Sequence, residues 1–250
     1  YNIFVSVKEK NHIMANRFCL NPVSYHGYGA IENIVPELLS HHLKKVLVVT
    51  DKSLVKFGVV ANVTKLLDAA KFDYVVFDDV KPNPTIKNIQ DGVVAYKEAK
   101  AEGIVAIGGG SAVDTAKGIG IIVTNPKFAD VRSLEGAAPT EEPCVFTIAV
   151  PTTAGTAAEV TINYVVTDEE KHRKFVCVDP HDMPNVAVVD PTMMSSMPKG
   201  LTAFTGMDAL THAIEGYVST LHCDYTDALA LHAIKMIHNN LKASFDGDKE

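Results

Sequence analysis

The sequence predicts an α/β protein with a doubly wound parallel sheet, followed by the start of an all-α domain. Short runs rich in valine and isoleucine alternate with segments of helix length along most of the chain. These runs are apolar on both faces, which is typical of parallel strands covered by helices on either side. Near residue 195 the apolar period becomes helical, and no further strand-like run follows. We therefore expect an α/β domain over residues 1–195 and the incomplete beginning of a helical domain over residues 196–250.

The expected elements follow one another in strand–helix order. Five buried strands are predicted, at residues 46–50, 74–77, 104–107, 145–150 and 186–189. Three helices are predicted between them, at about residues 59–70, 85–102 and 111–123. Thr85, after the break at Pro82-Asn83-Pro84, is expected to cap the second helix. A polar segment flanked by the apolar runs 162–166 and 174–178 predicts a β-hairpin with a solvated tip.

The helical part is predicted to begin with two helices. Six apolar side chains recur at helical spacing and share one face: Phe204, Met207, Leu210, Ile214, Tyr217 and Val218. A second helix is expected at about residues 225–241. The chain stops at Lys249-Glu250 without an obvious terminal signal, so we expect it to be a piece of a longer protein.

Composition and charge exclude several classes of protein. The 250 residues are 47% hydrophobic and 21% charged, the balance of an ordinary globular protein. No apolar run approaches the roughly 18 residues of a membrane span, and the N-terminus lacks the pattern of a secretory signal. The net charge is −7 and no basic stripe is present, so neither a membrane nor nucleic acid is an expected partner. The four cysteines are scattered without a C-x-x-C pair, which favours reduced thiols and a cytoplasmic location.

A glycine-rich turn is the first candidate site. Gly108, Gly109, Gly110 and Ser111 directly follow a predicted strand and open a helix. Glycines there let a phosphate approach the backbone, and the N–H groups of a helix N-terminus attract an anion. The turn matches neither G-x-G-x-x-G nor the P-loop pattern. Phosphate binding therefore competes with a structural alternative, in which Ser111 and Asp114 form a capping box.

Two further candidates lie at the carboxyl ends of predicted strands. Asp51 ends the first strand, where a carboxylate can accept hydrogen bonds from a ribose diol and repel a 2′-phosphate. A loop position or a helix cap is its more ordinary role. Thr152, Thr153 and Thr156 follow the fourth strand and offer hydroxyl groups to a sugar, phosphate or amide. Thr156 with Glu159 also fits a capping box, so a purely structural role is equally consistent with the pattern.

A pair of metal-ligand side chains occurs in the helical part. Asp208 and His212 are four residues apart and therefore lie on one face of the predicted helix. A carboxylate oxygen and an imidazole nitrogen in this arrangement can hold one divalent cation. The same two residues also lie on a polar face with Glu215 and Ser219, so a solvated face with one Asp–His contact is the alternative.

Five segments occur in a characteristic order along the chain. They are the strand that ends in Asp51, Pro82-Asn83-Pro84, GGGSxxD at 108–114, PTTAGTAAEVT at 151–161 and GMDALTHAIEGY at 206–217. In this order they resemble the iron-containing (group III) alcohol dehydrogenase family, from about Met14 onward. Residues 128–136 and 174–182 resemble members of that family that interconvert lactaldehyde and 1,2-propanediol. The residues before Met14 have no counterpart in the resemblance.

The resemblance implies a dinucleotide-binding α/β domain and a helical metal-binding domain, with the active site in the cleft between them. NAD is the implied coenzyme. Asp51 would bind its adenosine ribose, whereas Gly109, Gly110 and Ser111 would cradle its pyrophosphate. The other implied coenzyme contacts are Asn83, Thr152, Thr153, Thr156, Val165 and Lys174. Asn163 would border the nicotinamide and the substrate.

The resemblance also implies a metal centre. Asp208 and His212 would supply two of four protein ligands to Fe²⁺, with Zn²⁺ or another divalent metal as alternatives. Two further histidine ligands are expected beyond Glu250. His232 and His238 do not replace them, since a separation of six residues places side chains about 240° apart around a helix.

The implied reaction is reversible hydride transfer between NAD(H) and a small aldehyde or diol, with the metal acting as Lewis acid. Two alternatives stay open. One is a related metal- and NAD-dependent polyol or sugar enzyme, similar to glycerol dehydrogenase or dehydroquinate synthase. The other is a non-catalytic NAD-binding fragment without a complete metal site. A homodimer is also implied, with residues 17–20 as the strand that would pair between subunits.

Overall fold

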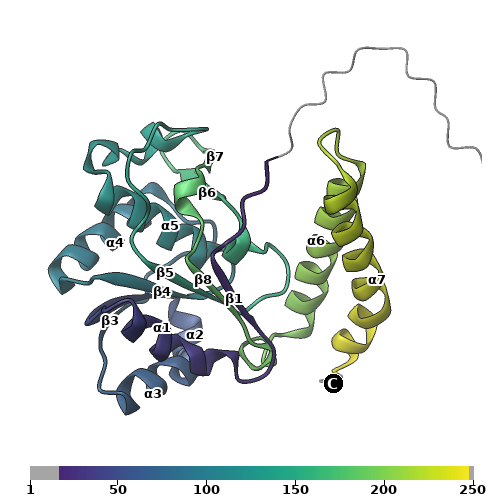
Figure 1. Cartoon of the computed structure of the whole chain (residues 1–250), viewed down its shortest axis with the longest axis horizontal. Helices are drawn as coiled ribbons and strands as arrows, with labels where there is room; N and C mark the ends of the chain where they lie inside the picture. The colour runs from purple at the N-terminus through teal and green to yellow at the C-terminus, as the bar shows by residue number, and fades with distance from the viewer. Residues whose placement is uncertain (1–16, 248–250) are drawn as a thin grey trace, which may run out of the picture.

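The structure, a computed structural model, describes residues 17–247 and contains an α/β part and a pair of long helices (Figure 1). Six strands form a parallel sheet in the order β1-β8-β5-β4-β2-β3, and two more form a separate antiparallel hairpin. The sheet strands are β1 (Val23–His26), β2 (Lys45–Val49), β3 (Asp73–Phe77), β4 (Gly103–Gly108), β5 (Thr147–Pro151) and β8 (Val186–Val189). The hairpin strands are β6 (Asn163–Asp168) and β7 (Arg173–Val178).

Helices cover both faces of the sheet. They are α1 (Ile34–Ser40), α2 (Lys52–Lys56), α3 (Ala61–Ala69), α4 (Ile86–Ala99) and α5 (Gly110–Thr124). Alternate residues of β2 enter two separate cores: Leu47 and Val49 join the core that includes α4 and α5, whereas Val46 and Val48 join the one that includes α1 and α3. This arrangement explains why consecutive residues of the central strands are apolar, as from Val46 to Val49 in β2. The predicted doubly wound α/β fold is confirmed.

The elements that the sequence did not reveal are short. All five predicted strands and the hairpin are present, and Thr85 caps α4 by accepting a hydrogen bond from the backbone N–H of Asn88 at 3.2 Å. β1 was missed because it has only four residues, Val23 is its one aliphatic residue, and it lies at the sheet edge with alternate residues exposed. α1 and α2 were missed because they have only seven and five residues. Residues 17–20 are irregular in this single chain, so their pairing between subunits stays a prediction.

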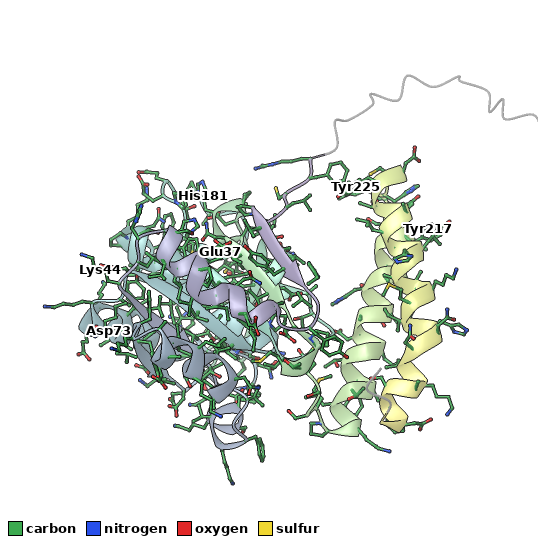
Figure 2. The ribbon with its side chains drawn as sticks, turned by 60° about the horizontal axis from the view of Figure 1, so that its bottom comes forward. Glu37, Lys44, Asp73, His181, Tyr217 and Tyr225 are labelled. Carbon is green, nitrogen blue, oxygen red and sulfur yellow. The ribbon has the colours of Figure 1, made fainter. Side chains whose placement is uncertain are left out.

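The last two elements are helices α6 (Lys199–Val218) and α7 (Asp224–Asp246), which pack on each other beside the α/β part (Figures 1 and 2). Both were predicted. The apolar side chains of α6 that share one face are largely exposed, with Phe204 at 77% and Val218 at 70% of their maximal accessible area. Met207 and Leu210 line a groove between α6 and α7, so α7 covers part of that face. No helix among residues 17–247 combines the length and the hydropathy that a membrane span requires.

Candidate coenzyme and metal site

The candidate site lies where the strand order of the sheet reverses. β3 lies on one side of β2, and β4 lies on the other. In open α/β sheets, such a reversal creates a crevice at the carboxyl ends of the two central strands, and ligands bind there. Asp51 follows β2, and the turn from Gly108 to Ser111 follows β4. The fold therefore brings these two predicted sites to the same edge of the sheet.

The glycine turn forms the N-terminus of α5. Gly109 is the N-cap residue and no side chain caps the helix, so the expected capping box of Ser111 and Asp114 is wrong. Both side chains bond elsewhere: Ser111 Oγ accepts from the backbone N–H of Asn83 at 3.2 Å, and Asp114 Oδ2 accepts from that of Val165 at 3.1 Å. An uncapped N-terminus has N–H groups available to an anion.

The threonine loop after β5 packs directly on the two glycines. A Cβ atom on Gly109 would lie 3.2 Å from Thr153 Oγ1, and one on Gly110 would lie 3.0 Å from Thr156 Oγ1. The backbone N–H of Thr152 donates to Gly108 O at 3.0 Å, which joins the two loops, and the Thr152 side chain is buried. A side chain at either position would press on a threonine, so the close approach favours glycine at both.

The other expected capping box, formed by Thr156 and Glu159, is also wrong. The helix there is a single 3₁₀ turn, Ala158–Val160, whose N-cap residue is Ala157 and which has no side-chain cap. Thr156 Oγ1 instead accepts from the backbone N–H of Ala158 at 3.4 Å.

Asn83 connects the glycine turn to the hairpin. Its backbone N–H reaches Ser111, and its Oδ1 accepts from Lys174 Nζ at 2.7 Å. Asn83 lies between two prolines with φ of 58°, a left-handed conformation that asparagine tolerates better than most residues. The neighbouring Pro84 O accepts from the backbone N–H of Thr167 in β6 at 2.8 Å. Of the residues predicted from the resemblance, Asn83 thus contacts two others, Ser111 and Lys174.

Asp51 has the ordinary role that the sequence left open. Its Oδ1 accepts from the backbone N–H groups of Ser53 at 2.8 Å and Leu54 at 3.0 Å, so it is the N-cap of α2. A Cβ on Gly108 would lie 3.5 Å from Leu54 Cδ1, which puts the start of α2 next to the glycine turn. Both bonds use one carboxylate oxygen, and ribose binding by the other stays a prediction.

Two charged residues of α5, the buried Lys117 and the half-buried Asp114, hold strand β6, a role that was not predicted from the sequence. Lys117 is fully buried, and its Nζ donates to Thr161 O at 2.6 Å, Thr161 Oγ1 at 3.1 Å and Asn163 O at 2.9 Å. Burial lowers the pKa of Lys117 to about 8 and raises the pKa of Asp114 to about 6. The available signal was two charged residues three apart in an otherwise apolar helix. The Asn163 side chain itself is exposed.

Asparagine in place of Asp114 is expected to change how stability depends on pH. Because burial raises the pKa of Asp114 from 3.8 to about 6, the folded state binds more protons than the unfolded state between these values. The free energy of unfolding of the wild type should therefore fall as pH rises through this window, by about 2–3 kcal/mol relative to Asp114→Asn. Urea unfolding between pH 4 and pH 7 measures the difference. A difference independent of pH would contradict the expectation.

The candidate metal ligands, Asp208 and His212, both lie on α6. His212 Nε2 is 3.7 Å from Asp208 Oδ1, and the two side chains are 53% and 44% exposed. A Cβ on Gly155, in the threonine loop, would lie 3.3 Å from Asp208 Oδ2, so this loop contacts the candidate metal ligand as well as the glycine turn. Within residues 17–247 no group of three or more His, Cys, Asp or Glu side chains could hold a metal ion. His222 pairs instead with Asp227, at 3.1 Å.

The sheet order and the uncapped glycine turn are those of α/β proteins that bind ligands at the carboxyl ends of their strands. The chain belongs to the iron-containing alcohol dehydrogenase family: residues 22–191 match the description "Iron-containing alcohol dehydrogenase". Residues 202–250 match "Fe-containing alcohol dehydrogenase family, C-terminal".

Individual relatives agree with this assignment. The chain is 54% identical over 237 residues to lactaldehyde reductase of Escherichia coli (strain K12), covering 95% of this chain and 62% of that protein. The structure of an alcohol dehydrogenase from Oenococcus oeni superposes with a TM-score of 0.89 at 43% identity, over 92% of this chain and 60% of the other. The structure of sulfoacetaldehyde reductase from Bifidobacterium kashiwanohense in complex with NAD⁺ superposes with a TM-score of 0.84 at 30% identity. This match covers 94% of this chain and 62% of the other. The chain thus spans less than two thirds of the length of these relatives.

Proposed function

We propose that this chain provides the NAD-binding part, and two metal ligands, of an iron-dependent alcohol dehydrogenase. Its substrates would be a small aldehyde and the corresponding alcohol or diol, with lactaldehyde and 1,2-propanediol as the first pair to test. The observation that carries the proposal is the uncapped N-terminus of α5, enclosed by the threonine loop and by the contact of Asn83 with Lys174. The similarity to lactaldehyde reductase supports the choice of substrate.

The coenzyme would bind along the carboxyl edge of the sheet. Asp51 would bind the adenosine ribose and disfavour a 2′-phosphate, since two negative groups would meet there. Gly109, Gly110 and Ser111 would hold the pyrophosphate through N–H groups at the helix N-terminus. The threonine hydroxyls, Asn83, Val165 and Lys174 would line the remaining path, and Asn163 would border the nicotinamide. NAD would carry the hydride, while these residues orient it.

Asp208 and His212 would hold a divalent cation, for which we propose Fe²⁺ because the family is described as iron-containing. A carboxylate and an imidazole on adjacent helical turns fit such an ion, although two donors are an incomplete set. The bound ion would polarise a carbonyl oxygen as a Lewis acid. We place the α/β domain at residues 1–195 and the start of the helical domain at residues 196–250. All four cysteines are free, which supports a reducing, cytoplasmic location, and we propose a homodimer on the family resemblance.

A second candidate function is non-catalytic NAD binding by this chain alone. It is favoured by the absence of a third metal ligand among residues 17–247. Two protein donors would leave most coordination positions to water and give weak binding. Binding of NAD⁺ without aldehyde-dependent NADH oxidation, in the presence of added Fe²⁺, would select this function. Assays with 1,2-propanediol and glycerol side by side separate the diol substrate from the polyol alternative.

Asparagine at position 51 is the sharpest test of the coenzyme proposal. Asparagine is as good an N-cap as aspartate, so Asp51→Asn should keep α2 folded while removing the negative charge. The wild type is expected to bind NAD⁺ more tightly than NADP⁺, and the variant to lose about tenfold of that preference. Titration calorimetry with both nucleotides measures the ratio. Equal preference in the two proteins would remove Asp51 from the site, and no NAD⁺ binding by the wild type would overturn the proposed function.

A further inference from the structure

We infer that Lys117 is a positioning residue for the coenzyme site, which it serves by fixing strand β6 to helix α5. The inference rests on the proposed function. Lys117 has no exposed surface with which it could touch a coenzyme itself. It acts through the backbone of Thr161 and Asn163, which enter and begin β6.

The outer edge of β6 is held by side chains of α5 instead of by another strand. β7 pairs with one edge of β6, and the opposite edge presents backbone groups of alternate residues. Asn163 O accepts from Lys117 Nζ, the N–H of Val165 donates to Asp114, and the N–H of Thr167 donates to Pro84 O. Two of these three partners come from α5, so the hairpin is fixed to that helix.

Helix α5 therefore carries both the glycine turn, at its N-terminus, and Lys117, which holds β6. Ser111, the last residue of the glycine turn, is the second residue of α5, and Lys117 lies six residues further along the helix. A helix is stiff over this length, so Lys117 sets where β6 lies relative to the turn. In the hairpin register, Lys174 pairs with Thr167, and Lys174 reaches Asn83 next to Ser111. A shift of β6 would move Asn163, Val165 and Lys174 together.

The energetics of Lys117 argue against simple filling of the core. Its ammonium group has three N–H donors and three oxygen acceptors within 3.1 Å, so it is completely satisfied. The side chains of Asp114, Asp182, Cys144 and Glu159 raise the pKa of Lys117, but burial lowers it by more. Taking an ammonium ion out of water is costly even when it is paired, and an apolar side chain would fill the space with less loss. A buried ammonium group at position 117 is accounted for if the edge of β6 has to be held in place by its hydrogen bonds.

The test compares Lys117→Met with Lys87→Met, a matched change at an exposed lysine of α4 that pairs with Asp91 on the surface. Titration calorimetry with NAD⁺ and with ADP separates the two halves of the site, because ADP would contact Asp51 and the glycine turn but not the hairpin. We expect Lys117→Met to bind NAD⁺ about tenfold more weakly and ADP within about twofold of the wild type. Lys87→Met should bind both nucleotides as the wild type does.

Hydrogen exchange measured by mass spectrometry supplies a readout that does not depend on a nucleotide. Peptides covering residues 161–178 should exchange faster in Lys117→Met, whereas those covering residues 103–108 should not change. If Lys117→Met does not fold, Thr161→Val decides by the same two measurements, since it removes one of the three acceptors and leaves the lysine in place.

The outcomes separate the inference from the proposed function. The positioning role would be overturned if Lys117→Met weakened the binding of NAD⁺ and ADP equally, since the lysine would then only stabilise the fold. It would also be overturned if hydrogen exchange in residues 161–178 were unchanged, since the lysine would then not hold the hairpin. A wild-type chain that binds neither nucleotide would overturn the proposed function. Selective loss of NAD⁺ affinity together with faster exchange in residues 161–178 would support both.

Discussion

Valine in place of Gly110 is expected to weaken NAD⁺ binding by about 100-fold while the chain stays folded. A Cβ at this position would already lie 3.0 Å from both Oγ1 and Cγ2 of Thr156, and the two methyl groups of valine extend further. Thr156 is exposed, so its loop can move aside without disturbing the core. The displaced loop and the added methyl groups would then occupy the space over the N-terminus of α5. Titration calorimetry with NAD⁺ and a thermal melt of the same protein measure the two effects.

Gly200→Ala is the matched control for this change. Gly200 lies in the first turn of α6, and a Cβ there would meet no atom within 4 Å. Alanine should leave NAD⁺ affinity unchanged and stabilise the helix slightly, because alanine has the higher helix propensity. If Gly110→Val bound NAD⁺ like the wild type, the glycine turn could not be the pyrophosphate cradle. If it lost affinity and unfolded together, the milder Gly110→Ala would decide between the two causes.

The strands and the location of the site could be predicted because both depend on local pattern. A parallel strand covered on both faces is apolar throughout, and Leu47 and Val46 show this by entering opposite cores. The carboxyl ends of such strands meet at one edge of the sheet, so Asp51 and the glycine turn had to lie near each other. The i, i+4 spacing of Asp208 and His212 likewise required them to share a helix face.

The partners of individual polar side chains could not be predicted, because they depend on distant segments. Ser111 and Asp114 had the spacing of a capping box, but each bonds to a backbone N–H that comes from another part of the chain. Lys117 had no recognisable motif, since its acceptors are 44 and 46 residues away. Local sequence gives the candidates for such contacts, whereas the packing of the hairpin on α5 decides between them.

Alanine in place of Asp208 is expected to weaken binding of a divalent cation by about 100-fold and to leave NAD⁺ affinity within about twofold of the wild type. Loss of a residue that only supports a metal ligand costs 10- to 100-fold in affinity, so loss of the ligand itself should reach at least the upper value. The wild-type chain should bind Co²⁺, used as a spectroscopic probe, only weakly, because Asp208 and His212 are two donors. A Co²⁺ titration followed by the NMR signals of the His212 ring measures binding at this position.

Glu215→Ala separates ligation from general attraction of a cation. Glu215 is an exposed carboxylate on the same helix, so its loss removes the same charge from the same surface. If Asp208 is a ligand, Glu215→Ala should weaken Co²⁺ binding much less than Asp208→Ala does. Equal effects of the two variants would mean that Co²⁺ only senses the negative charge of α6, and the solvated Asp–His contact would then be the better description. The threonine loop contacts both Asp208 and the glycine turn. If Asp208→Ala also lost affinity for NAD⁺, the loop would have moved. The Co²⁺ titration would then be repeated with Asp208→Asn.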